Sequence, residues 1–167
     1  MTWEGFQYFR RGFKVYSNYG LKFPHTLLTK KVFDEMIKNK EQLQNAVLLL
    51  DEMHVWIDSR SSMKQKNKGI TYFILQTRKR NVRLLYSTQH LHQVDKRLRD
   101  STDVIVFCRN LSNKTSTVKS ADAPTYILLE SVFQWREEMT PKKRILYANP
   151  VYPLYDTTEM IDWTDDS

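Results

Sequence analysis

The sequence predicts an α/β fold with a mainly parallel sheet, and three observations support this prediction. Apolar runs alternate with amphipathic segments in the order strand, helix, strand, helix, strand, which is typical of parallel crossover units. The run Ala46–Leu50 is apolar throughout, which indicates a strand buried on both faces. The chain of 167 residues is 41% apolar with only 4 Gly and 5 Pro, which is enough for an ordinary core and excludes a low-complexity chain.

The first expected elements are a helix and a short strand. Aromatic residues at three-to-four spacing predict a helix over residues 3–11, which Gly12 ends, and residues 14–17 follow as a strand. Thr29 is placed to cap a second helix. The apolar face of that helix consists of Val32, Phe33, Met36 and Ile37.

The central segment carries the alternating pattern. Residues 46–50, 82–87 and 103–108 are expected to be inner strands of one parallel sheet. Residues 70–80 and 91–99 are expected to be the helices between and after the first two of these strands.

The end of the chain differs from the centre in pattern and charge. Residues 125–134 and 144–147 predict extra edge strands or a hairpin. Residues 156–167 form an acidic tail with five carboxylates and no basic residue, so residues 1–155 hold 26 basic residues against the other 14 acidic ones, a net charge of +12. Such a basic body suggests contact with a polyanion, although charge alone does not select one.

Two expected inner strands end in residues that carry chemistry. Residues 48–52 are three leucines followed by Asp51 and Glu52, and the next strand ends near Gln89. Apolar residues followed by paired carboxylates resemble the Walker B arrangement of P-loop NTPases, in which one acid holds Mg²⁺ and the other polarises the attacking water. Solvated acids at a strand end, and a glutamine that merely starts a helix, are the plain alternatives. The two strand ends together favour an NTPase.

The order of these motifs resembles the Zot-type (zonula occludens toxin-type) and related viral ATPases of the FtsK–HerA group of P-loop motors. The resemblance spans roughly residues 10–110 and is carried by an Asp-Glu strand, a Gln-x-Arg-x-Arg helix and a Thr-Gln strand. Its residues are Lys14 to Asn18, Leu48 to Glu52, Asp58 to Arg60, Leu75 to Arg80, Ser87 to Gln89 and Val94 to Arg99.

The resemblance implies a three-layer P-loop NTPase-type sheet and an ATP-hydrolysing motor for packaging DNA or assembling virions. It implies that Asp51 binds Mg²⁺, that Glu52 is the general base and that Gln89 senses the γ-phosphate. It further implies a homo-oligomeric ring in the host cytoplasm, acting on DNA without sequence preference and contacting viral structural proteins.

One part of the P-loop pattern is missing from the sequence. The motif G-x-x-x-x-G-K-[ST] supplies the backbone N–H groups and the lysine that hold the phosphates. None of the 4 glycines is followed by Lys-Ser or Lys-Thr. The fold is therefore expected to be incomplete at its N-terminus, with residues 1–155 as a partial NTPase domain. The P-loop is expected from an upstream segment or from a separate chain.

Several basic residues are candidates for roles at an interface. Arg78 and Arg80 are candidate arginine fingers toward a neighbouring subunit, with ordinary surface ion pairs as the alternative. A basic segment after the Asp-Glu pair is a candidate contact for DNA phosphates, or a solvated loop. Its basic residues are Arg60, Lys64, Lys66 and Lys68.

Two other function classes remain open on the sequence. One is a non-hydrolysing protein whose basic body binds nucleic acid or a viral partner. The other is a metal nuclease that uses Asp51, Glu52 and Asp58, which the lack of a further carboxylate cluster disfavours. No membrane span or signal peptide is expected, and one cysteine excludes an internal disulfide.

Overall fold

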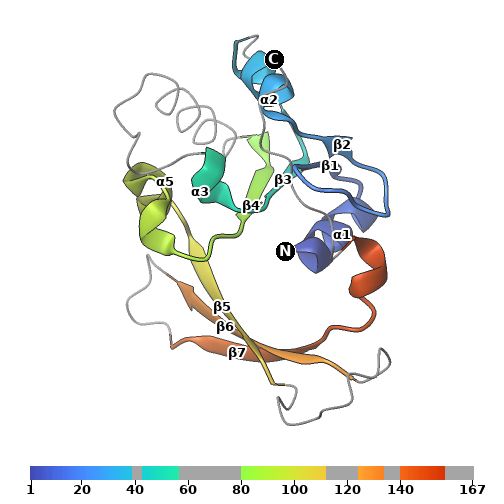
Figure 1. The fold of residues 1–167 in the computed structure, drawn as a ribbon, viewed down its shortest axis with the longest axis vertical. Helices are drawn as coiled ribbons and strands as arrows, with labels where there is room; N and C mark the ends of the chain where they lie inside the picture. Colours follow the sequence, from blue (N-terminus) through green and yellow to red (C-terminus); the bar gives the residue numbers. More distant parts are fainter. Residues whose placement is uncertain (39–42, 57–79, 112–123, 134–139, 157–167) are drawn as a thin grey trace. The chain divides into compact units, whose positions relative to one another are not determined.

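A computed structural model describes residues 1–38, 43–56, 80–111, 124–133 and 140–156 (Figure 1). The chain divides into two compact units. Unit 1 comprises Met1–Ser101 with Leu154–Ser167, and unit 2 comprises Thr102–Pro153. In the described part of the chain, no helix is both long and apolar enough to cross a membrane.

Unit 1 is built on a four-stranded parallel sheet with the strand order β2-β1-β3-β4. The strands are β1 (Lys14–Ser17), β2 (Thr26–Leu27), β3 (Ala46–Leu50) and β4 (Val82–Tyr86). The mainly parallel α/β fold predicted from the sequence is confirmed. β3 lies inside the sheet between β1 and β4, which explains why its five residues are all buried.

Two apolar clusters cover the two faces of this sheet. On one face, alternate residues of β3 (Ala46, Leu48 and Leu50) contact buried residues of α2 (Lys30–Lys38), α3 (Met53–Trp56) and α5 (Lys96–Asp100). On the other face, Val47 and Leu49 pack with aromatic residues of α1 (Thr2–Arg10). The strand is therefore apolar at every position because its side chains alternate between two buried layers.

The helix α1 approaches β3 closely at Gly5. A Cβ atom added to Gly5 would lie 2.5 Å from Cδ1 of Leu49, so a side chain here would require the buried Leu49 side chain or the helix to shift. Thr2 is the first residue of this helix, and its hydroxyl group is hydrogen-bonded to that of Tyr19 at a distance of 3.0 Å. Tyr19 follows the end of β1, so the N-terminus of α1 lies at the carboxyl edge of the sheet.

The second predicted helix is confirmed in its position and its start. The helix α2 begins after Thr29, whose Oγ1 accepts a 3.2 Å hydrogen bond from the backbone N–H of Val32. Its buried residues include Phe33 and Met36, both from the predicted apolar face.

The helix predicted over residues 91–99 is interrupted. A 3-10 turn, η3 (Leu91–Gln93), is followed by Val94 in an extended conformation, and α5 starts only at Lys96. The break occurs because Asp95 caps α5, accepting a 2.9 Å hydrogen bond from the backbone N–H of Arg97. The helix predicted over residues 70–80 lies almost entirely outside the described residues.

Unit 2 is a three-stranded antiparallel sheet with the order β5-β6-β7. Its strands are β5 (Val104–Asn110), β6 (Tyr126–Phe133) and β7 (Lys142–Tyr147). The predicted C-terminal hairpin is confirmed as β6 and β7. The prediction that residues 103–108 join the parallel sheet is wrong, because β5 pairs along its full length with β6 instead.

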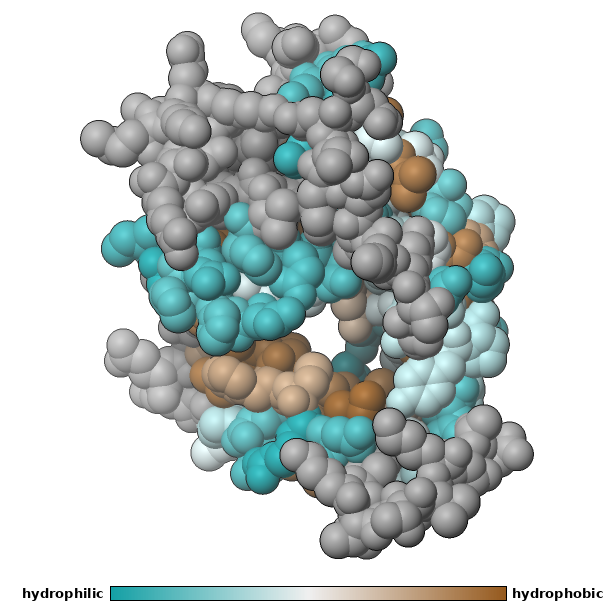
Figure 2. Space-filling view, viewed as in Figure 1, coloured by the Kyte–Doolittle hydropathy of each residue, from teal (hydrophilic) through white to brown (hydrophobic). Residues whose placement is uncertain are grey.

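The sheet of unit 2 buries very little of its own surface. Among its strand residues only Leu129 is buried, at 8% exposure, while Phe107 and Ile145 are 58% and 63% exposed. Figure 2 shows hydrophobic and hydrophilic areas side by side on the visible face of this part of the chain. The apolar pattern of β5 therefore predicted a strand correctly but not the sheet to which it belongs.

Candidate functional site

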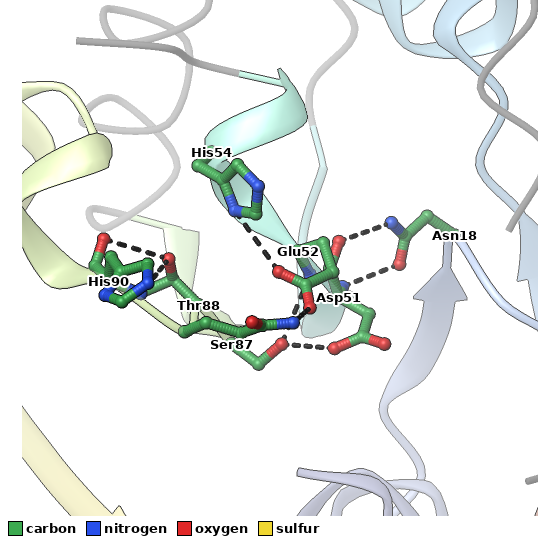
Figure 3. Close-up of polar contacts among 8 residues, drawn as sticks. Asn18, Asp51, Glu52, His54, Ser87, Thr88 and His90 are labelled. Atoms are coloured by element: carbon green, nitrogen blue, oxygen red, sulfur yellow. Dashed lines mark hydrogen bonds and ion pairs between the residues drawn. The ribbon is translucent and has the colours of Figure 1, made fainter.

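The carboxyl edge of the parallel sheet brings together polar residues from three strand ends (Figure 3). Asn18 follows β1 and holds the backbone of Asp51, which follows β3. Its Oδ1 accepts a 2.7 Å hydrogen bond from the N–H of Asp51, and its Nδ2 donates a 2.9 Å bond to the carbonyl oxygen of Asp51. Asn18 is buried, so this pair of bonds fixes where the Asp51 side chain leaves the sheet.

Ser87, at the end of β4, supports the same turn from the other side. Its hydroxyl donates a short hydrogen bond to Oδ1 of Asp51 and accepts a 3.2 Å bond from the backbone N–H of Glu52. The carbonyl oxygen of Ser87 accepts a 2.9 Å bond from the N–H of Met53. Three successive residues after β3 are thus bonded to a single residue after β4.

Glu52 has a backbone conformation that is unusual for a residue with a side chain. Its φ angle is +50°, in the left-handed region. This conformation costs about 1–2 kcal/mol for an ordinary L-residue, and it persists where surrounding contacts over-determine it. The bonds from Ser87 supply such contacts. The turn directs the Glu52 side chain away from that of Asp51 and toward the end of β4 (Figure 3).

The carboxylate of Glu52 has a polar neighbour at each oxygen. Oε1 accepts a 2.9 Å hydrogen bond from Nε2 of Gln89, and Oε2 lies 3.2 Å from Nδ1 of His54. His54 is the second residue of α3, and the first, Met53, is fully buried. The structure therefore brings together Glu52 and Gln89, which the sequence predicted to act at one site.

A buried phenol lies close to this edge. Burial raises the pKa of Tyr19 to about 12, and the negative charge of Asp51 acts in the same direction, while hydrogen bonding with Thr2 opposes the shift. Tyr19 is therefore neutral at physiological pH. It joins the N-terminus of α1 to the neighbourhood of Asp51.

The described residues contain no group of three or more His, Cys, Asp and Glu side chains placed to hold a metal ion. Asp51 offers one carboxylate, and the Ser87 hydroxyl lies beside it. This set fits Mg²⁺ of the kind that takes one or two protein ligands and completes its shell with phosphate oxygens and water. It does not by itself supply the ligand set of a metal held by the protein alone. The nuclease hypothesis also uses Asp58, which lies outside the described residues, and it stays a hypothesis.

Among the other predicted site residues, Arg80 is described by the structure, and its backbone lies apart from this cluster. The carbonyl oxygen of Arg80 accepts a 3.3 Å bond from the N–H of Asn45, which places the Arg80 backbone at the amino edge of the sheet, opposite Asp51. A role for Arg80 toward a neighbouring subunit stays a prediction. The remaining residues lie outside the described residues: Asp58, Arg60, Lys64, Lys66, Lys68 and Arg78.

Sequence reasoning missed three residues of the cluster. Asn18 and Ser87 are polar residues directly after strands, so the rule that parallel strands end at one edge would have placed both there. His54 follows Glu52 by two residues, and no sequence signal distinguishes it from a surface histidine. Its contact depends on the left-handed turn at Glu52.

The family model described as "Zonular occludens toxin (Zot)" matches residues 7–158. The chain belongs to the Zot family. A crystal structure of the N-terminal domain of zonular occludens toxin from Neisseria meningitidis has the same fold, with a TM-score of 0.58 and 20% identity over 86% of this chain and 80% of that one.

Curated proteins of bacteriophages are similar to this chain in sequence. The "Gene 1 protein" of Enterobacteria phage fd and that of Enterobacteria phage M13 are each 27% identical to this Zot-family chain over 139 residues. The match covers 76% of this chain, and the chain spans 40% of the length of these relatives. The family member described here is therefore similar to one part of longer phage proteins.

Proposed function

We propose that this chain is part of an ATP-hydrolysing motor for DNA packaging or virion morphogenesis, of the FtsK–HerA type of P-loop ATPase. The observation that carries the proposal is the 2.9 Å hydrogen bond between Gln89 and Glu52 beside Asp51, at the carboxyl edge of a parallel sheet. In open α/β sheets ligands bind at this edge. The likeness to phage Gene 1 proteins supports an assembly role.

In this proposal the polar residues have separate roles. Asp51, aligned by Asn18 and Ser87, is the Walker B residue that holds Mg²⁺, and Glu52 takes a proton from the attacking water. Gln89 hydrogen-bonds the water or the γ-phosphate and so links the end of β4 to hydrolysis. When bound, ATP would supply the phosphoryl group that is transferred, and Mg²⁺ would neutralise the negative charge that develops on it.

The phosphate-binding half of the site is not encoded in these 167 residues, which lack G-x-x-x-x-G-K-[ST]. The position of α1 indicates where the phosphate-binding half would lie. The hydrogen bond between Thr2 and Tyr19 holds the N-terminus of α1 at the carboxyl edge of the sheet. The N-terminus of a helix is a favourable place for a phosphate group. We propose that a P-loop, supplied by an upstream segment or by a separate chain, lies next to the N-terminus of this helix. We further propose that the assembled motor is a ring in the host cytoplasm.

The test compares nucleotide binding with and without a P-loop. The 167-residue chain alone is expected neither to bind ATP tightly nor to hydrolyse it, because most phosphate affinity comes from the P-loop backbone and lysine. Joined to a segment that carries G-x-x-x-x-G-K-[ST], it is expected to show Mg²⁺-dependent ATPase activity, and Asp51→Asn is expected to weaken Mg²⁺-nucleotide binding. No ATPase activity with any such segment would contradict the proposal.

The alternative is a non-hydrolysing protein that binds nucleic acid or a viral partner, and the missing P-loop motif together with the net charge of +12 over residues 1–155 favours it. Both proposals expect DNA binding without sequence preference and with steep salt dependence. Neutralising Lys64, Lys66 and Lys68 together is expected to flatten the salt slope if they contact phosphates. A folded chain that binds DNA yet ignores ATP under all these conditions would favour the alternative.

A further inference from the structure

The contact between His54 and Glu52 is the feature of the site that the proposed roles leave unused. Nδ1 of His54 and Oε2 of Glu52 lie 3.2 Å apart, and both atoms are shielded from solvent. Neither atom has a hydrogen bond of good geometry among the described residues. The close polar contact of each is with the other. Buried polar atoms left in this state are rare, and their presence at a site calls for a functional reason.

The local fold determines that His54 faces Glu52. Met53 is buried in the core and its N–H is bonded to Ser87, which anchors the start of α3. The left-handed turn at Glu52, with φ of +50°, sends the carboxylate back toward the first turn of that helix. Figure 3 shows the imidazole of His54 above the carboxylate of Glu52.

The two neighbours of Glu52 restrict its carboxylate in complementary ways. Gln89 holds Oε1 through a 2.9 Å bond, and the imidazole stands 3.2 Å from Oε2. With one neighbour the carboxylate can rotate about its last torsion, whereas two neighbours at different oxygens define its plane. A general base must present one lone pair to a water molecule, so its orientation affects the rate more than the binding of substrate.

We infer that His54 is a positioning residue that orients the carboxylate of Glu52 for proton abstraction. The inference rests on the proposed ATPase function and adds a residue to it. His54 acts through Glu52 and does not itself touch the nucleotide. Its removal therefore affects kcat and leaves KM for ATP unchanged.

The test uses three substitutions of His54 in the P-loop-containing protein. His54→Ala is expected to lower kcat about 10- to 100-fold with KM unchanged, the usual cost of a misplaced catalytic group. His54→Asn is expected to restore most of the rate, because its amide nitrogen is as many bonds from Cα as Nδ1. His54→Gln, whose amide nitrogen lies one bond further out, is expected not to restore it. His92→Ala, at an exposed histidine, is the matched control and is expected to keep the parent rate.

A double-mutant comparison separates positioning from general stability. In a Glu52→Gln background, His54→Ala is expected to cause no further loss of kcat, because the group on which it acts is gone. An additive loss, or a loss that neither amide restores, would overturn the inference and make His54 a structural residue. A parent-like kcat in His54→Ala, alongside an inactive Glu52→Gln protein, would overturn the inference while the proposed function stands.

A second measurement does not depend on hydrolysis. In the 167-residue chain, the side-chain carboxyl ¹³C signal of Glu52 is expected to shift in His54→Ala and to stay in place in His92→Ala. An unmoved signal in His54→Ala would overturn the contact itself. A moved signal in a P-loop-containing protein that shows no hydrolysis would overturn the proposed function, and with it the catalytic role of His54.

Discussion

The parallel sheet of unit 1 and the antiparallel sheet of unit 2 use similar apolar strands in opposite ways. β3 is buried at every position between two helical layers, whereas only one residue of β5, β6 and β7 is buried. All polar residues of the candidate site follow strands of the first sheet. The comparison teaches that burial on both faces gives the strand ends of unit 1 the rigid placement that a catalytic site requires.

The largest expected difference is between the same substitution, Glu to Gln, made after a strand of unit 1 and within a strand of unit 2. Glu52→Gln, in the P-loop-containing protein, is expected to lower the hydrolysis rate about 10²- to 10⁴-fold without weakening ATP binding, because the proposed function assigns to Glu52 only the role of general base. Glu130→Gln in β6 removes a carboxylate 3.4 Å from Nζ of Lys143 and is expected to leave the rate unchanged. Steady-state ATPase assays and nucleotide-binding titrations make the comparison. Full activity in Glu52→Gln would remove the Walker B assignment.

The next difference concerns stability. Leu49 in β3 is fully buried, so Leu49→Ala is expected to lower the free energy of unfolding by about 2–5 kcal/mol through lost burial and the cavity left behind. Ile145 in β7 is 63% exposed, so Ile145→Ala is expected to change it by less than about 0.5 kcal/mol. Urea unfolding of both variants measures this. Comparable losses would mean that the unit 2 sheet is covered in solution, for example by a second copy.

The buried phenol of unit 1 predicts a loss of stability at high pH. The pKa of Tyr19 is about 12 in the folded chain, and that of an unfolded tyrosine is about 10. Because the neutral form is favoured in the fold, its contribution is complete below pH 10 and is lost as the pH rises toward 12. The expected loss is about 2–3 kcal/mol.

Unfolding free energies measured between pH 9 and pH 12 test this prediction. The pH-dependent loss is expected to shrink in Tyr19→Phe, which has no hydroxyl to ionise. Tyr147→Phe, at a tyrosine that is 48% exposed in unit 2, is the control and is expected to behave like the parent. An unchanged pH profile in Tyr19→Phe would place the sensitive group elsewhere.

The smallest effect tests the ion pair of Asp95, the residue whose cap divides the predicted helix. The hydrogen bonds and charge of Arg97 lower the pKa of Asp95 below its ordinary value, against the opposing effect of burial. A carboxyl with a lowered folded pKa contributes stability above its unfolded pKa of about 4, and this contribution is lost as the pH falls through the folded value. Asp95→Asn is expected to cost about 1 kcal/mol at pH 7, because Asn caps a helix as well as Asp does but does not form the ion pair with the Arg97 guanidinium.

The measurement for Asp95 is the unfolding free energy at pH 7 and at pH 3. The difference between parent and Asp95→Asn is expected to be smaller at pH 3, because the carboxyl of the unfolded parent, with a pKa of about 4, is then largely protonated and the stabilisation from the charged form is reduced. The exposed pair Lys96 and Asp100 in the same helix gives the control, Asp100→Asn. It is expected to cost less than Asp95→Asn at pH 7, because exposed ion pairs contribute little.

Local features of the sequence were enough for most elements of unit 1. The five apolar residues of Ala46–Leu50 require a covering layer on each face of the strand, whatever its position in the sheet. Asp51 and Glu52 come next in the chain and therefore lie at the end of this strand. Thr29 caps α2 as predicted, since its hydrogen bond spans three residues. Such features depend on neighbours in the chain, so the amino-acid order alone determined them.

Only the tertiary structure decided which strands pair and how the site closes. β5 has the apolar composition of an inner parallel strand, yet it pairs with the antiparallel strand β6. The composition of a strand does not determine which distant strand it pairs with. The clamp of Asn18 on Asp51 joins residues 33 positions apart. His54 and Glu52 face each other because the backbone at Glu52 is left-handed, and hydrogen bonds with Ser87, which follows β4, stabilise this turn. These contacts exist because the sheet brings separate strand ends to one edge, and that is a property of the fold rather than of any one segment.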